Sequence, residues 1–110
     1  MADEHATILL SRTSPDDVGV REIYVSIDGQ SVGVLRPGNT IAREVAPGHH
    51  VVKADNTLFR RTRECELAAG ETAEFLAINT AGGGSAVLAI LMAVLGVGPL
   101  NLKFDRVIAP

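Results

Sequence analysis

The sequence predicts a mostly β protein, an antiparallel β-sandwich of about seven or eight strands, with one short apolar helix at about residues 86–95 before the last strand. Apolar and polar residues alternate with a period of two over roughly the first 80 residues. Turn signals recur about every eight to twelve residues, the spacing typical of sandwiches and barrels. From Glu74 to Lys103 the chain has no charged residue in between. Its 110 residues form a single domain, 1–110, with one hydrophobic core.

The clearest strand is predicted at residues 23–27, where three β-branched residues alternate with polar neighbours. Asp28-Gly29 follows at once, and this dipeptide favours a tight hairpin because glycine tolerates a positive φ. An earlier strand is expected at residues 7–11, followed by a polar loop over residues 13–19.

Turn residues set the bounds of the remaining strands. Pro37-Gly38 and Pro47-Gly48 favour two turns because proline presets its own φ. Gly70 marks a third turn. We therefore expect further strands at residues 31–35, 40–45, 49–54, 62–67, 72–79 and from 100 to 107 or 108.

Residues 82–100 form a glycine-rich hinge and an apolar helix within the domain. Three successive glycines, 82–84, precede Ser85, which is suited to cap a helix beginning at Ala86. Glycines and a proline within 96–99 end it. A phosphate-binding loop would need a lysine after the glycines, and no Lys or Arg lies between residues 64 and 102.

This helix carries small residues on one stripe and large apolar residues on the rest of its surface. The small residues are spaced three, four and three apart, so we expect them to lie against a closely approaching backbone. A helix that is apolar all round must be buried in protein or in lipid. The candidates for an interface or a membrane contact are Ala86, Leu88, Ala89, Leu91, Met92, Ala93, Leu95 and Gly96.

Composition excludes several classes of function. Ten Lys and Arg against 13 Asp and Glu give a net charge of −3, which argues against nucleic-acid binding. Aromatic residues are 4% of the chain and Trp is absent, so base-stacking platforms are not expected. A single cysteine excludes an internal disulfide and a thiolate zinc cluster. The acidic N-terminus lacks the apolar core of a signal peptide, which predicts a location in the cytoplasm or on the cytoplasmic face of a membrane.

Four short motifs within residues 21–74 carry a family resemblance. They are Ile-Asp-Gly at 27–29, Val-Gly-Val at 32–34, Ala-Pro-Gly-His-His at 46–50 and Ala-Gly-Glu-Thr at 69–72. This rhythm of strands and turns resembles PEGA-type domains, which are small β-sandwich modules of bacterial and archaeal proteins. The resemblance implies an accessory module with no catalytic residues to carry over. Residues 82–100 lie outside it.

The residues that could carry chemistry each have an ordinary structural interpretation. His49 and His50 are neighbours on a strand and point to opposite faces, so they are not expected to share a metal ion. Cys65 lies between Glu64 and Glu66, whose carboxylates disfavour a thiolate, and we interpret it as a half-buried structural thiol. No metal site, cofactor or catalytic set is predicted.

A small basic cluster is formed by Arg60, Arg61 and Arg63, with Lys53 on a paired strand. Because neighbours on a strand alternate between faces, the arginines do not form one stripe. We expect them to pair with nearby carboxylates, those of Glu64, Glu66 or Asp55. The alternative is a weak contact with an anion or an acidic lipid.

These observations predict a non-catalytic interaction or assembly module, a homo-oligomer that associates with itself through the apolar C-terminal helix. The alternative is a small membrane-attached protein whose apolar segment inserts into the cytoplasmic leaflet, since about 20 apolar residues suffice for a bilayer contact. An enzyme is not expected, because no convergent set of polar residues can be nominated.

Overall fold

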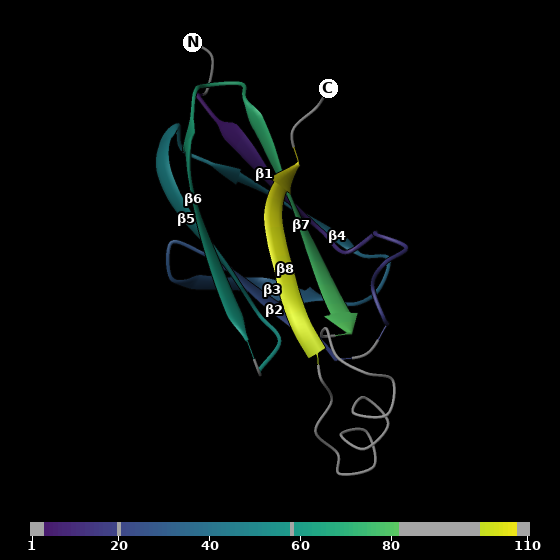
Figure 1. Cartoon of the computed structure of the whole chain (residues 1–110). Coiled ribbons are helices and arrows are strands. Elements are labelled where there is room, and N and C mark those ends of the chain that lie inside the picture. The colour runs from purple at the N-terminus through teal and green to yellow at the C-terminus, as the bar shows by residue number, and fades with distance from the viewer. Residues whose placement is uncertain (1–3, 20, 58, 82–99, 108–110) are drawn as a thin grey trace.

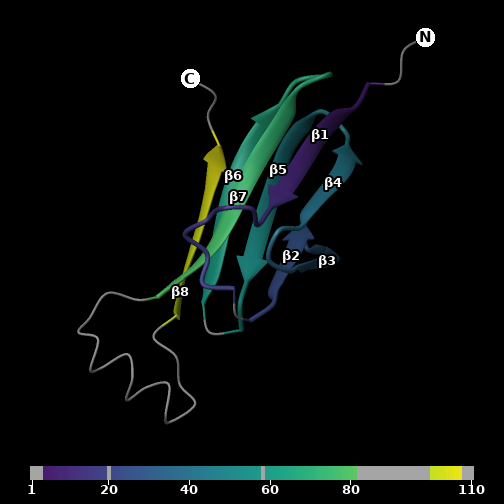
Figure 2. The ribbon, with the colours of Figure 1, turned by 90° about the vertical axis from the view of Figure 1, so that its right-hand side faces the viewer.

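Eight strands in two four-stranded sheets make up the part of the chain that the computed structural model describes, residues 4–19, 21–57, 59–81 and 100–107 (Figures 1 and 2). The strands are β1 (Ala6–Ser11), β2 (Ile23–Ile27), β3 (Gln30–Leu35), β4 (Thr40–Val45), β5 (Gly48–Asp55), β6 (Arg60–Leu67), β7 (Thr72–Ala81) and β8 (Leu100–Val107). One sheet has the order β4-β1-β7-β8, and the other has the order β3-β2-β5-β6. The prediction of a mostly β fold is thus confirmed.

Each predicted strand has a counterpart within a few residues of its expected bounds. The strand expected at 40–45 coincides with β4, while β7 continues to Ala81 and β6 begins at Arg60. The agreement follows from the period-two pattern, because alternate residues of these strands face the same core. On β2, for example, Ile23, Val25 and Ile27 are all buried.

The expectation of purely antiparallel sheets is wrong in one place, because β1 pairs in parallel with β7. Every turn reverses the direction of the chain, so strands whose numbers differ by an odd number run in opposite directions. All other pairs in the sheets, including β1–β4 and β2–β5, differ in this way and are antiparallel. β1 and β7 differ by six, and they therefore run in the same direction.

A single hydrophobic cluster lies between the two sheets and takes residues from both. Its two largest rings, Phe75 on β7 and Phe104 on β8, stack with centroids 5.5 Å apart. Ile8, Ile23 and Leu35, from β1, β2 and β3, are fully buried in the same cluster. Both sheets therefore contribute residues to one core.

The predicted hairpin after β2 is confirmed. Asp28 has φ 53° and Gly29 has φ 82°, and two successive positive values are what a two-residue type I′ turn requires. The pairing of β2 with β3 shifts register between Val25 and Ser26, so this pair also contains a β-bulge.

The helix predicted at residues 86–95 lies outside the described residues. What the structure places are the two strand ends that flank it. Ala81, the last residue of β7, is paired with Leu100, the first residue of β8. The chain therefore leaves the sheet and rejoins it at adjacent positions.

The turns lie at two opposite ends of the molecule, the hairpin end and the segment end. The hairpin end carries the β2–β3 turn at Asp28 and the β4–β5 turn at Ala46. The segment end carries the β1–β2 loop, the β5–β6 turn at Asn56, and the positions Ala81 and Leu100.

Candidate functional site

His49 and His50 lie on opposite faces of β5, as predicted from the alternation along a strand. The exposed ring of His49 lies between two carboxylates of β6, 2.9 Å from Glu64 and 3.0 Å from Glu66. The His50 side chain is directed inward and is buried. Over the described ranges, no group of three or more metal-ligating side chains is found.

His50 is held by acceptors on both ring nitrogens. Its Nδ1 lies 2.6 Å from a carboxylate oxygen of Asp28, and its Nε2 lies 2.6 Å from the carbonyl oxygen of Ala46. A carbonyl and an ionised carboxylate can only accept hydrogen bonds, so both contacts are hydrogen bonds at once when the ring is an imidazolium with a proton on each nitrogen. The ring thus joins the β2–β3 turn to the β4–β5 turn.

The same contacts shift the pKa values of both partners. The hydrogen bond to the Ala46 carbonyl, followed by that to Asp28, raises the pKa of His50 above its ordinary value of 6.5, although burial opposes the shift. The pKa of Asp28 is lowered, first by the Val51 N–H that donates to it at 2.8 Å and then by His50. Each group therefore stabilises the charged form of the other.

A groove with a volume of about 420 Å³, the β3–β4 groove, lies beside this pair between the edge strands β3 and β4. Its lining includes Val32, Val45, Arg43 and His50. Arg43 spans the two strands, because its Nη2 donates at 2.9 Å to the carbonyl of Val32. Both basic groups of the groove are thus already engaged by the protein itself, which makes it a poor site for acid–base chemistry.

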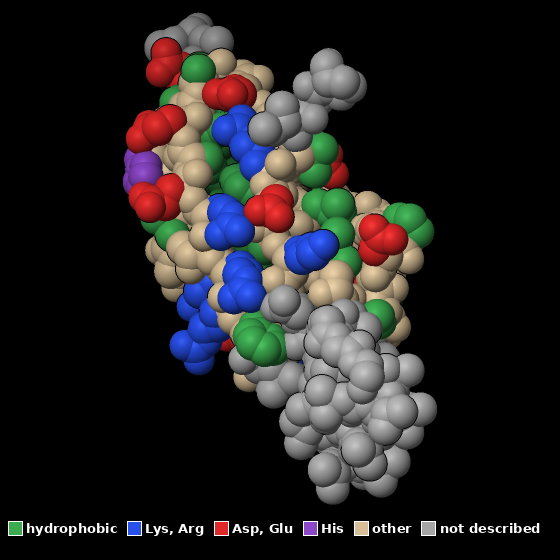
Figure 3. Space-filling model, in the orientation of Figure 1, with side chains coloured by type: hydrophobic (Ala, Val, Ile, Leu, Met, Phe, Trp, Pro, Cys, Tyr) green, Lys and Arg blue, Asp and Glu red, His purple; other side chains and the backbone are tan. Residues whose placement is uncertain are grey.

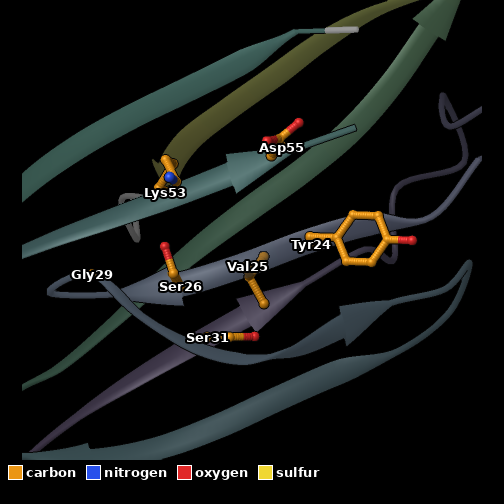
Figure 4. A pocket seen from close by; sticks show the side chains of 7 residues that line it. All are labelled: Tyr24, Val25, Ser26, Gly29, Ser31, Lys53 and Asp55. Atoms are coloured by element: carbon orange, nitrogen blue, oxygen red, sulfur yellow. The ribbon is translucent and has the colours of Figure 1, made fainter. Parts of the chain in front are cut away.

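A second groove, of about 240 Å³, lies over β2, β3 and β5 (Figure 4). Tyr24 and Ser26 come from β2, and Lys53 and Asp55 come from β5. The close-up shows that the hydroxyl of Tyr24 points away from Lys53, so these polar groups do not converge on one point. The ammonium group of Lys53 forms no hydrogen bond or ion pair with another described residue. The groove therefore supplies polar surface without a catalytic arrangement.

Basic and acidic side chains are intermixed along β6 and β8 (Figure 3). The expected pairing of Arg60 with Asp55 is confirmed at 3.0 Å. Arg63 pairs instead with Asp105 of β8 at 3.1 Å, a partner that lies 42 residues away in the sequence. Arg61 donates at 3.0 Å to the carbonyl of Leu102, so it ties the edge of β6 to the edge of β8.

Cys65 is a buried residue of β6, more deeply buried than the half-buried thiol we expected. Burial raises the pKa of its thiol. A neutral, buried thiol is a weak nucleophile, which supports its interpretation as a structural residue.

Sequence reasoning missed a buried polar network at the segment end. Arg12 and Asp17 form an ion pair with an Nε–Oδ1 distance of 2.9 Å. The buried amides of Asn56 and Asn79 bond each other at 3.0 Å, and the Asn79 backbone N–H donates to Asp17 at 2.8 Å. Arg12 and Asp17 lie in a stretch that looks like an ordinary polar loop, so no pattern in the sequence indicated that they would be buried together.

The eight residues predicted for an interface or membrane contact, Ala86, Leu88, Ala89, Leu91, Met92, Ala93, Leu95 and Gly96, all lie outside the described residues. Among the residues that are described, no helix has the length and apolar character that crossing a bilayer requires. Comparison of the chain with protein-family models, with curated proteins and with solved structures finds no match.

Proposed function

We propose that this protein is a non-catalytic assembly module, a PEGA-type β-sandwich that associates with itself through its apolar segment, residues 82–99. The sandwich assignment is supported by the one hydrophobic cluster shared by the two sheets. A binding module is favoured over an enzyme because the basic groups of the β3–β4 groove are tied to a carboxylate or to backbone carbonyls.

The observation that carries the proposal is the pairing of Ala81 with Leu100. Two residues suffice to connect directly opposed strand ends in a hairpin, yet the chain places 18 residues there. These include seven large apolar residues, Val87, Leu88, Ile90, Leu91, Met92, Val94 and Leu95. Burying each of them is worth roughly 1.5–3 kcal/mol, so an association that removes them from water is strongly favoured.

The pairing of Ala81 with Leu100 also limits the ways in which the segment can enter a membrane. Because the segment begins and ends side by side, it cannot cross a bilayer once and leave β8 on the far side. Half of the segment in helical form reaches about 13 Å, close to the roughly 15 Å depth of one leaflet. The alternative therefore becomes insertion into one leaflet and return, which fits the predicted cytoplasmic face.

The direct test replaces residues 82–99 by Asn-Gly, so that Ala81 and Leu100 are joined by a two-residue turn. Light scattering after size-exclusion chromatography should show a smaller assembly for this variant than for the full chain. Flotation with phosphatidylcholine vesicles covers the alternative, in which the full chain binds vesicles and the variant does not. An unchanged mass together with unchanged flotation would refute both roles of the segment.

A point variant separates the two roles in the full chain. Leu91→Lys should lower the assembly mass if residues 82–99 bind a second copy, because the charge would be buried in the contact. If the segment enters lipid, the same variant should instead lose vesicle binding while its mass in solution is unchanged. The matched control is Val51→Lys, since Val51 is a half-buried apolar residue of β5, on the outer face of the other sheet.

A further inference from the structure

The outer face of the sheet β4-β1-β7-β8 has an apolar centre. On β7, Phe75 and Ala77 are buried in the core, so the alternating residues Leu76 and Ile78 point outward, where they are half-buried. Leu9 on β1 is placed in the same way. These side chains sit on the two central strands of the sheet, where no other described strand covers them.

Two oppositely charged residues of β8 lie directly beside Leu76 and Ile78. In the register of the two strands, Leu76 is paired with Asp105 and Ile78 with Lys103. Directly opposed residues of antiparallel strands share a face, so all four side chains belong to the outer surface. The Lys103 side chain is exposed and forms no hydrogen bond or ion pair with the other described residues, while Asp105 uses its Oδ1 to hold Arg63.

The block of four residues is self-complementary. Consider a half-turn about an axis that is parallel to the sheet, perpendicular to its strands and centred on the block. This rotation places Leu76 over Ile78 of a second copy, and it places Lys103 over Asp105 of that copy. Apolar side chains thus meet apolar side chains, and each charge meets its opposite, as a closed two-fold interface requires.

We propose that a second copy of this chain docks on this face, with Leu76 and Ile78 at the centre and two Lys103–Asp105 pairs beside them. Sheets that pack face to face lie about 10 Å apart with their strands within about 30° of parallel or antiparallel, and a two-fold axis of this kind gives that geometry. The outer face of the other sheet lacks such a block, since Ser26 and Lys53, paired on β2 and β5, are both polar.

This surface is separate from residues 82–99, and its use does not depend on the function proposed above. If both surfaces associate, one chain has two distinct contacts, and its assemblies grow beyond the dimer.

The test uses two full-length variants, Lys103→Glu and Asp105→Lys, each of which makes the facing charges alike in a pair of identical chains. Each variant alone should therefore show a dissociation constant raised at least about tenfold, as like charges face each other at both sites. In an equimolar mixture, the two introduced side chains face each other with opposite charges. The unchanged Asp105 of the first variant likewise faces the unchanged Lys103 of the second. The mixture should regain the assembly mass of the wild type.

Lys53→Glu is the matched control, since it makes the same change on the outer face of the other sheet, and it should leave the mass unchanged. Circular dichroism melts of all variants check that the fold is retained. The proposal is overturned if both single variants keep the wild-type mass, or if the mixture does not recover it. Failure of the self-association through residues 82–99 would be seen separately, as an unchanged mass of the variant that lacks them.

Discussion

Each end of the molecule contains a different kind of charge pair. At the segment end, the Arg12 and Asp17 side chains are 0% and 5% exposed, so the pair is removed from water. At the hairpin end, the His50 side chain is 10% exposed, but its partner Asp28 is 47% exposed. One pair is therefore part of the core, and the other lies at its boundary with solvent.

This difference determines how each end responds to pH. An arginine side chain is charged at every ordinary pH. Burial raises the pKa of Asp17, but hydrogen bonds from Arg12, Asn79 and Gly19 outweigh this effect and hold the pKa below its usual value. The segment end is thus insensitive to pH above the acid range. The hairpin end depends on a histidine, whose charge changes near neutrality.

The largest effect is expected from Arg12→Met. This variant leaves the Asp17 carboxylate buried without its cation and removes the donors to the carbonyls of Arg21 and Leu35. Breaking one partner of a buried pair costs about 3–5 kcal/mol, so the free energy of unfolding measured by urea denaturation should fall by that amount. Arg60→Met breaks the exposed pair with Asp55 and should cost only about 0–1 kcal/mol. Equal costs for the two variants would contradict the distinction between the pairs.

Gly29→Val should have the next largest effect, at the hairpin end. Gly29 has φ 82°, a conformation that a β-branched residue adopts only with strain, so we expect a loss of about 1–2 kcal/mol. Gly29→Asn is the control, because asparagine tolerates the left-handed region and should cost much less. Thermal melts that cannot distinguish Val from Asn at this position would show that the strain is relieved elsewhere.

A smaller effect is expected from pH itself. The raised pKa of His50 means that its contribution to stability is complete below pH 6.5 and is lost as the pH rises through the folded-state value. The lowered pKa of Asp28 means that its contribution is complete above pH 3.8 and is lost as the pH falls through its folded-state value. The pair therefore stabilises the fold most between about pH 4 and pH 6.5.

His50→Gln should remove the decline in melting temperature on the alkaline side of this range, because glutamine does not titrate there. His49→Gln is the control, since His49 is exposed and lies outside the pair. A decline that persists in His50→Gln and disappears in His49→Gln would assign the titration to His49 and contradict the prediction.

The smallest effect is expected for Lys53→Ala, on the outer face of β5. Its ammonium group has no bond to other described residues, so the change in the free energy of unfolding should stay within about 0.5 kcal/mol. A loss comparable with that of Gly29→Val would show that this face also holds the molecule together.

The strands could be predicted because each of them repeats a local signal. The β-branched residues of β2 and the Asp28-Gly29 turn, for example, determine both the strand and its end. The direction of β1 relative to β7 could not be predicted, since it depends on how many strands lie between them and on which sheet each joins. The period of two carries no such information.

The partners of the candidate residues were harder to predict than the residues themselves. The sequence indicated that His50 and His49 face opposite ways, but the bond of His50 to Asp28 arises from the register between β2 and β5. Arg63 was noted as part of a basic cluster, whereas Asp105 lies on another strand of another sheet. Side-chain partners across sheets are set by packing, which a single sequence does not display.

The strict reversal of direction at every turn has a consequence for how this domain can be attached to others. β1 begins and β8 finishes beside the start of β7, because Thr7 pairs with Thr72 and Glu74 with Val107. The strand that enters the sheet, β1, and the strand that leaves it, β8, are therefore about 10 Å apart, two strand spacings, and their outer ends both lie at the hairpin end. A neighbouring domain fused before β1 or after β8 would therefore be attached at the hairpin end, and the segment end would stay accessible.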